Sequence, residues 1–153
     1  VDITKISSTL GIDRRKLTGY LELLEKTYFI HLVAPFSRNV DREISQRRKI
    51  YLADTGILQQ LAQVNSGQVF ENQVYLQLMK RGSVSYYQRK SGAEIDFIFN
   101  GTTAIETKET VHPGDLATLQ RRAKSIKIPD VMLVSKLSSG DQFKDFTWAG
   151  TLF

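Results

Sequence analysis

Four charged residues in the carboxy-terminal half have the types and spacing of a divalent-metal site. Asp96, Glu106 and Lys108 follow the pattern D-x(9)-E-x-K, and Glu71 lies upstream on an apolar stripe. A hard cation prefers oxygen ligands and keeps several waters, so Asp96, Glu106 and the carbonyl of Thr107 would hold it, with Glu71 completing the site through a water. Lys108 would orient or deprotonate the attacking water and offset phosphate charge. The predicted chemistry is phosphodiester hydrolysis with Mg²⁺ or Mn²⁺.

This spacing occurs by chance in many sequences, and a lone Glu71 more often pairs with a nearby cation than with a metal. The elements around the four residues therefore matter. Hydrophobic periodicity predicts them in the order α, β, β, β, α, β: residues 69–79, 84–88, 94–99, 103–108, 116–126 and 131–134. The predicted fold class is α+β or α/β.

The turn between the second and third strands decides whether the two central carboxylates meet. A two-residue turn at 100–101 would send Glu106 to the face opposite Asp96, because a shift of one residue reverses every side chain. A three-residue loop over residues 99–101 would place Asp96 opposite Ala104 and diagonal to Glu106, about 7–8 Å away. We therefore expect an odd-length turn, or a bulge in one strand, if the site forms.

The amino-terminal half has the layout of a winged helix-turn-helix. A short helix stops at Gly11, Asp13 caps a second helix, and strand-like stretches follow at residues 29–33 and 49–52. Basic residues at the start of the second helix and in the wing would contact DNA phosphates. These residues are Arg14, Arg15, Lys16, Arg47 and Arg48, with Arg38 and Arg42 further out in the wing. Solvated surface or a protein contact is the competing interpretation of the same charges.

Composition and length agree with two small modules. The 153 residues divide into a predicted winged helix-turn-helix domain at 1–62 and a second domain at 63–153, with the joint at residues 63–67. The net charge of +5 favours an anionic partner where the cations cluster, and zero cysteines exclude disulfides and thiolate metal sites. No apolar run reaches the roughly 20 residues that cross a bilayer, so we expect no membrane contact and a cytoplasmic protein. The start at Val1 suggests a piece of a longer chain.

Three stretches carry a resemblance to a known family: VFENQVYLQL, YYQRKSGAEIDFIF and AIETKE. They resemble the carboxy-terminal domain of unknown function that follows the ATPase core in many bacterial and archaeal AAA+-like ATPases. That family carries a winged helix just before a PD-(D/E)XK, restriction-endonuclease-like fold with an αβββαβ core. The resemblance covers nearly all of the chain and implies the same positions, Glu71, Asp96, Glu106 and Lys108.

The chain departs from the nuclease pattern at two positions, neither of which is a ligand. Ile95 replaces the proline that often precedes the first aspartate, and Thr107 stands where an apolar residue is usual. No G-x-x-x-x-G-K-[ST] motif occurs, so an ATP site would belong to an upstream ATPase domain outside this sequence.

Three functions remain open from the sequence. The first is a metal-dependent nuclease that cuts DNA at the Asp96, Glu106 and Lys108 site, with the winged helix supplying duplex affinity. The second is a catalytically inactive regulatory or partner-docking domain of the ATPase. The third is a simple winged-helix DNA binder, which leaves the second module unexplained. The substrate and the oligomeric state are not encoded in any pattern we find.

Overall fold

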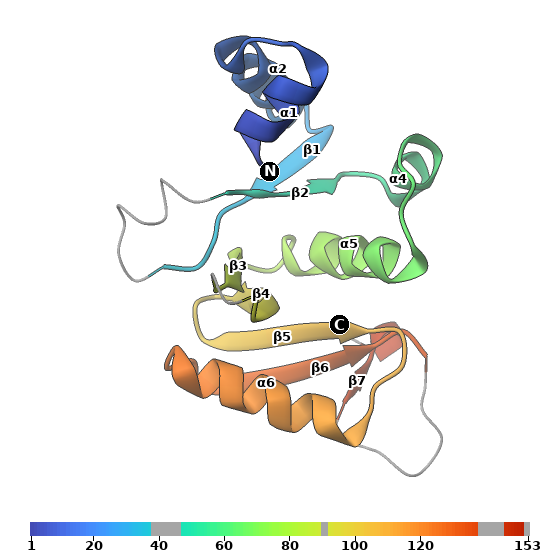
Figure 1. Ribbon diagram of the computed structural model, residues 1–153. Helices are drawn as coiled ribbons and strands as arrows, with labels where there is room; N and C mark the ends of the chain where they lie inside the picture. Colours follow the sequence, from blue (N-terminus) through green and yellow to red (C-terminus); the bar gives the residue numbers. More distant parts are fainter. Residues whose placement is uncertain (38–46, 90–91, 138–145, 152–153) are drawn as a thin grey trace.

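The computed structural model describes residues 1–37, 47–89, 92–137 and 146–151. Within them the chain has a mixed α+β fold with five α-helices, a two-stranded sheet and a five-stranded sheet (Figure 1). The elements are α1 (Ile3–Leu10), α2 (Arg14–Lys26), β1 (Ile30–Val33), β2 (Lys49–Leu52), α4 (Thr55–Leu61), α5 (Ser66–Leu78), β3 (Val84–Gln88), β4 (Glu94–Phe99), β5 (Thr103–Lys108), α6 (Pro113–Ser125), β6 (Asp130–Ser135), β7 (Thr147–Trp148) and the 3₁₀ turn η1 (Ala149–Thr151). The predicted order α, β, β, β, α, β is present from α5 to β6.

Local side-chain caps explain where the first helices begin and end. Asp2 and Asp13 accept hydrogen bonds from backbone N–H groups in the first turns of α1 and α2. Gly11, with a φ of +64°, ends α1 in the left-handed conformation that glycine adopts without strain. The antiparallel pair β1 and β2 follows, in the register Ile30 opposite Leu52. The tip between these two strands, including Arg38 and Arg42, lies outside the described residues.

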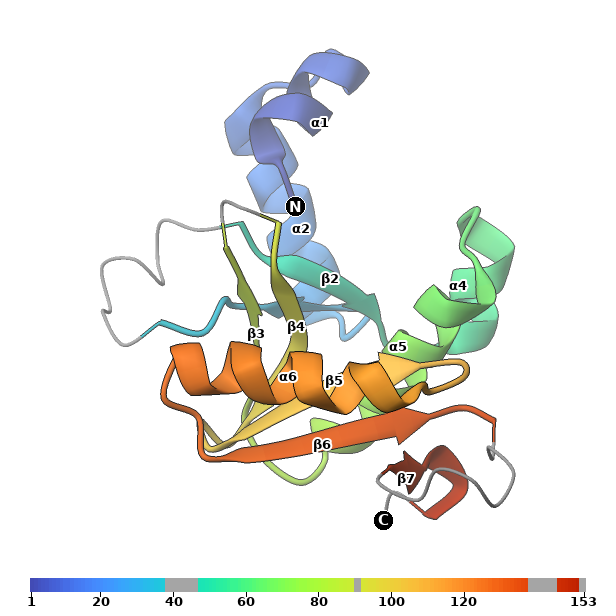
Figure 2. The same ribbon diagram turned by 60° about the horizontal axis from the view of Figure 1, so that its bottom comes forward.

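The larger sheet is mixed and is covered on both faces. Its strand order is β3-β4-β5-β6-β7, with antiparallel pairing from β3 to β5 and parallel pairing from β5 to β7. Helix α5 packs on one face, and α6, which links the parallel strands β5 and β6, packs on the other (Figures 1 and 2). Such a crossover connection normally carries a helix.

The core on the α5 side is shared between the two halves of the chain. Val33 of β1 and Tyr51 of β2 are buried in one cluster with Val74 and Tyr75 of α5 and with Phe97 of β4. The rings of Tyr51 and Tyr75 are stacked, with centroids 4.3 Å apart. Of the expected joint at residues 63–67, residues 63–65 lie between α4 and α5 and residues 66–67 begin α5. The small sheet and α5 form one apolar core across this joint.

The turn between β4 and β5 has the odd length that was expected, with a different register. Phe99 pairs with Thr103, so the loop is residues 100–102 and not residues 99–101. Asn100 and Gly101 both have positive φ. Continuing the register places Asp96 opposite Glu106, two residues beyond Ala104, which was the predicted partner.

A bulge in β4 changes which face Asp96 uses. Asp96 and Phe97 both lie opposite Tyr86 of β3, so one extra residue is inserted in β4. Ile95 and Ile98, on either side of the bulge, both pack into the cluster on the α6 side. Phe97 packs on the α5 side. Counted back from Phe97, simple alternation would put Asp96 on the α6 side. The bulge instead lets Asp96 lie on the same side as Phe97.

Candidate functional site

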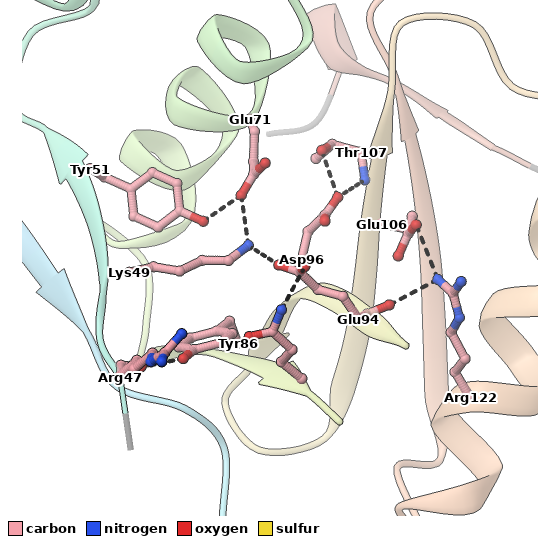
Figure 3. Close-up of polar contacts among 11 residues, drawn as sticks. Arg47, Lys49, Tyr51, Glu71, Tyr86, Glu94, Asp96, Glu106, Thr107 and Arg122 are labelled. Carbon is pink, nitrogen blue, oxygen red and sulfur yellow. Dashed lines mark hydrogen bonds and ion pairs between the residues drawn. The ribbon is translucent and has the colours of Figure 1, made fainter. Parts of the chain in front are cut away.

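Asp96 lies where β4 and β5 separate, and its carboxylate replaces part of the strand ladder. Its Oδ2 accepts hydrogen bonds from the backbone N–H and the hydroxyl of Thr107, each at 2.8 Å. Burial raises the pKa of Asp96, and the negative charges of Glu106 and Glu71 raise it further, to about 7, against the two bonds from Thr107 that lower it. Figure 3 shows the side chains of Asp96, Glu71 and Glu106 in the same region of the molecule.

Glu106 is buried and is held by two cations. Its Oε1 lies 3.1 Å from Nζ of Lys108 and 3.3 Å from Nη1 of Arg122 on α6. Its Oε2 is buried without a hydrogen-bond partner. A buried carboxylate oxygen without a donor carries a desolvation cost, so this atom has capacity for a cation or a donor. The Arg122 side chain reaches Glu106 from the face of the sheet that α6 covers.

Glu71 is bound from the amino-terminal half of the chain. Its Oε1 accepts hydrogen bonds from the hydroxyl of Tyr51 at 2.6 Å and from Nζ of Lys49 at 3.1 Å. The Lys49 ammonium also forms an ion pair with Glu94 of β4 and lies 5.3 Å from the centre of the Tyr86 ring. Lys49 of β2 therefore links α5 and β4, two elements of the other half (Figure 3).

The charge around Lys49 fixes its protonation. Burial lowers the pKa of Lys49, but the charges of Glu71, Glu94 and Asp96 and the bond to Glu94 outweigh it, so the pKa is raised overall. Burial and the adjacent Glu71 also raise the pKa of Tyr51. At neutral pH the site therefore contains an ammonium ion and a neutral phenol on the same carboxylate.

The predicted ligands gather in one region but approach it from different sides. Ala104 packs on the α6 side and Ile105 on the α5 side, so the alternation of β5 puts Glu106 and Lys108 on the α6 side. Asp96 is tied to Thr107, on the α5 side. The expectation that Asp96 and Glu106 share one face of the sheet is therefore wrong, because the bulge in β4 removes Asp96 from the face that Glu106 occupies. Among the described residues, no group of three His, Asp or Glu side chains has the arrangement of a metal site.

Two family models together match almost the whole chain. A domain of unknown function, DUF8612, matches residues 1–68, and a second domain of unknown function, DUF4143, matches residues 66–149. The chain belongs to the DUF4143 family. The uncharacterized protein MJ1544 of Methanocaldococcus jannaschii is 27% identical over 163 residues, which cover 96% of this chain and 36% of that protein. The chain thus spans about a third of the curated relative that it matches. No solved structure matches it.

The predicted DNA-contacting residues lie in the DUF8612 region, and all five are exposed. Arg14, Arg15 and Lys16 form the first turn of α2. Arg47 forms an ion pair with Asp2 at 2.7 Å. Arg48 directly precedes β2. None of the helices in the described part of the chain is both long and apolar enough to span a membrane.

Sequence reasoning missed the cations that complete the site. Lys49 and Arg122 were not singled out, although Lys49 contacts Glu71 and Arg122 contacts Glu106. The sequence signal for Arg122 is its place on α6 beside Leu119 and Ala123, the buried residues of that helix. Lys49 has no such signal, because its partners lie on other elements of the fold.

Proposed function

We propose that this chain is the carboxy-terminal region of an AAA+-like ATPase and that its DUF4143 domain is a PD-(D/E)XK nuclease-like domain that processes DNA with Mg²⁺ or Mn²⁺. The element order from α5 to β6 and the resemblance of its motifs support the nuclease-like fold. The DUF8612 region would be a winged helix that supplies DNA affinity. The upstream ATPase domain would lie outside this sequence. MJ1544 is longer than the region it shares with this chain, which covers 36% of that protein.

The observation that carries the proposal is the buried Oε2 of Glu106, which has no hydrogen-bond partner among the described residues although Lys108 and Arg122 bind the other oxygen of the same carboxylate. Burial, and then the charges of Glu106 and Glu71, raise the pKa of Asp96 to about 7. A divalent cation relieves such repulsion and favours the ionised form of each ligand. The unpartnered Oε2 of Glu106 provides a free oxygen donor in the same region.

The roles of the residues follow from their positions. Asp96 and Glu106 would be the direct ligands if both turn toward the gap where β4 and β5 separate, and the Thr107 carbonyl and Glu71 would complete the site. A divalent metal ion bound there supplies a Lewis acid and an activated water. Lys108, 3.1 Å from Glu106, would orient that water or offset phosphate charge.

A second function is favoured by the cations already present. Lys49, Lys108 and Arg122 pair with Glu71, Glu94 and Glu106 and offset most of the negative charge without a metal. Such a closed network is what a catalytically inactive docking domain of the ATPase would retain after losing the chemistry. The two functions differ in whether the carboxylates bind a divalent ion.

Calorimetry with Mn²⁺ separates the two functions. We expect the parent chain to bind Mn²⁺ and the double variant Asp96→Ala plus Glu106→Ala to lose most of that affinity, because hard cations need carboxylate ligands. Glu109→Gln is the matched control, since Glu109 is an exposed carboxylate on the same segment. Cleavage of plasmid and oligonucleotide DNA with Mn²⁺ is then compared in the same three proteins. Equal Mn²⁺ binding in all three would exclude the nuclease and leave the docking domain.

A further inference from the structure

A hollow lined by three arginines lies beside the carboxylate cluster, on the side of the sheet that α6 covers. It has a volume of about 300 Å³. Its lining residues are Tyr87, Arg89, Ala93, Arg121, Arg122 and Ser125. Three of these six side chains are guanidinium groups, and none is acidic. The positive charge is therefore concentrated in one small space.

The hollow is built by neutral groups that fix the position of Arg89. Nε of Arg89 donates to the hydroxyl of Tyr87 at 2.9 Å, and Nη2 donates to the hydroxyl of Ser125 at 2.9 Å. Ser125 in turn donates to the backbone carbonyl of Arg122. Among the described residues, neither Arg89 nor Arg121 forms an ion pair with a carboxylate. Two of the three arginines thus have no counter-charge within the part of the chain that the structure describes.

Arg122 connects this hollow to the carboxylate cluster. Its Nη1 donates to the backbone carbonyl of Glu94 at 2.8 Å and to Glu106 at 3.3 Å. A group bound between the arginines would therefore lie next to Glu106. The ordinary explanation for cations here is the dipole of α6, whose last turn favours positive charge. That explanation does not cover Arg89, which follows β3 and not α6.

We propose that this hollow binds a backbone phosphate of a nucleic acid. The planar forks of arginine match the oxygens of a phosphate, and the Tyr87 and Ser125 hydroxyls add further donors. A phosphate would supply the counter-charge that Arg89 and Arg121 lack. The hollow would then be the place where the DUF4143 domain contacts its nucleic-acid substrate. This inference rests on the proposed function, although phosphate binding requires neither the metal nor cleavage.

A polymer fits better than a small phosphate compound because positive groups continue along α6. Residues 116–129 contain four basic residues and no acidic one. A second hollow, of about 540 Å³, lies at the end of α6 and the turn that follows it, and its lining includes Lys124 and Lys127. Two neighbouring cationic sites suit the regular phosphates of a strand.

Fluorescence anisotropy with labelled single-stranded and duplex oligonucleotides tests the proposal. The measurements are made in EDTA, so that metal binding and cleavage play no part. We expect the double variant Arg89→Gln plus Arg121→Gln to weaken binding by about tenfold for each arginine, and the salt slope to fall by about one for each lost contact. Lys80→Gln plus Arg81→Gln, at the end of α5, removes the same charge outside the hollow and should leave both nearly unchanged.

Two further measurements separate the proposal from its alternatives. Arg121 is exposed, so Arg121→Glu retains the fold and should weaken binding even where the double variant unfolds. Inorganic phosphate is titrated as a competitor, and displacement of the oligonucleotide only at a large molar excess supports a polymer ligand. Displacement at equal phosphate-group concentration would overturn the proposal in favour of a small phosphate ligand. Equal losses in the arginine and control variants would also overturn it. A parent chain that binds the oligonucleotide through these arginines but does not bind Mn²⁺ would count against the nuclease alone.

Discussion

The protonation of Asp96 is the residue-scale property on which the candidate site depends. Two hydrogen bonds from Thr107 favour the carboxylate, but burial and the charges of Glu106 and Glu71 outweigh them. The folded protein thus holds this proton up to about pH 7, whereas the unfolded chain releases it near its ordinary pKa of 3.8. Between these values the folded state binds more protons, so stability decreases as pH rises.

We predict that Asp96→Asn removes this pH dependence. In the parent chain in EDTA, the free energy of unfolding should fall by on the order of 2–4 kcal/mol between about pH 4 and 7, and then level off. Asparagine keeps an acceptor for Thr107 but cannot ionise, so the variant should lose this fall and be the more stable protein above pH 7. Urea unfolding at each pH measures it, with exposed Glu22→Gln as the control. The same fall in Asp96→Asn would mean that another group titrates.

Lys49 is the residue that joins the two halves electrostatically. Replacing it with Met leaves Glu71 and Glu94 partly buried without their shared cation. We predict a loss of about 1–3 kcal/mol in the free energy of unfolding. A double-mutant cycle with Glu71→Gln isolates the pair, because the second change removes the charge that the first leaves unpaired. Strictly additive effects would show that the ion pair contributes nothing to stability.

Residue types selected part of this site and could not select the rest. Charged side chains at strand and helix positions that face a core are unusual unless they have a function. This is why the sequence draws attention to Glu71, Asp96, Glu106 and Lys108. Lys49 does not stand out, because lysine at the start of a strand is ordinary and Glu71 lies 22 residues away. Which groups meet Lys49 is determined by the docking of β2 on α5, a tertiary contact that no local pattern contains.

At the scale of elements, α5 and the β1–β2 ribbon form one packing unit despite the linker between them. We predict that a protease cuts first at residues 63–65, which lie between α4 and α5 outside any helix or strand. The two fragments should stay together in gel filtration, because Val33 and Tyr51 are buried against α5. They should separate only in denaturant. Fragments that part under native conditions would mean that the two halves are independent domains.

Periodicity predicts the bounds of the helices and strands more closely than it predicts the register between the strands. The predicted strands at 84–88, 94–99 and 103–108 have the observed bounds, and α5 begins three residues earlier than predicted because Asn65 caps it. The odd-length turn was predicted from parity, but its position was displaced by one residue. The bulge at Asp96 was left only as an alternative, since alternation of apolar residues predicts a regular strand. The bulge lets Ile95 and Ile98, three residues apart, both pack on the α6 side.

At the scale of the whole molecule, cations lie on both halves, and the DUF8612 region has its own predicted DNA surface. We predict that changing Arg14, Arg15, Arg47 and Arg48 to Glu weakens duplex binding strongly and reduces its salt slope, because these exposed side chains would contact phosphates. Anisotropy at several salt concentrations measures both quantities. Unchanged affinity and slope would place the duplex on the DUF4143 domain alone.

The shared apolar core also constrains the order in which the chain can fold during synthesis. Val33 of β1 and Val134 of β6 belong to the same cluster, with about a hundred residues between them. Because β6 lies between β5 and β7 in the sheet, the parallel half of the sheet cannot form before β6 has left the ribosome. The β1–β2 ribbon can contact α5 and β4 through Tyr51 earlier, but its apolar cluster stays incomplete on a nascent chain until β6 has emerged. Translation arrested before β6 should yield a chain that is sensitive to protease and binds chaperones, whereas arrest after β7 should not.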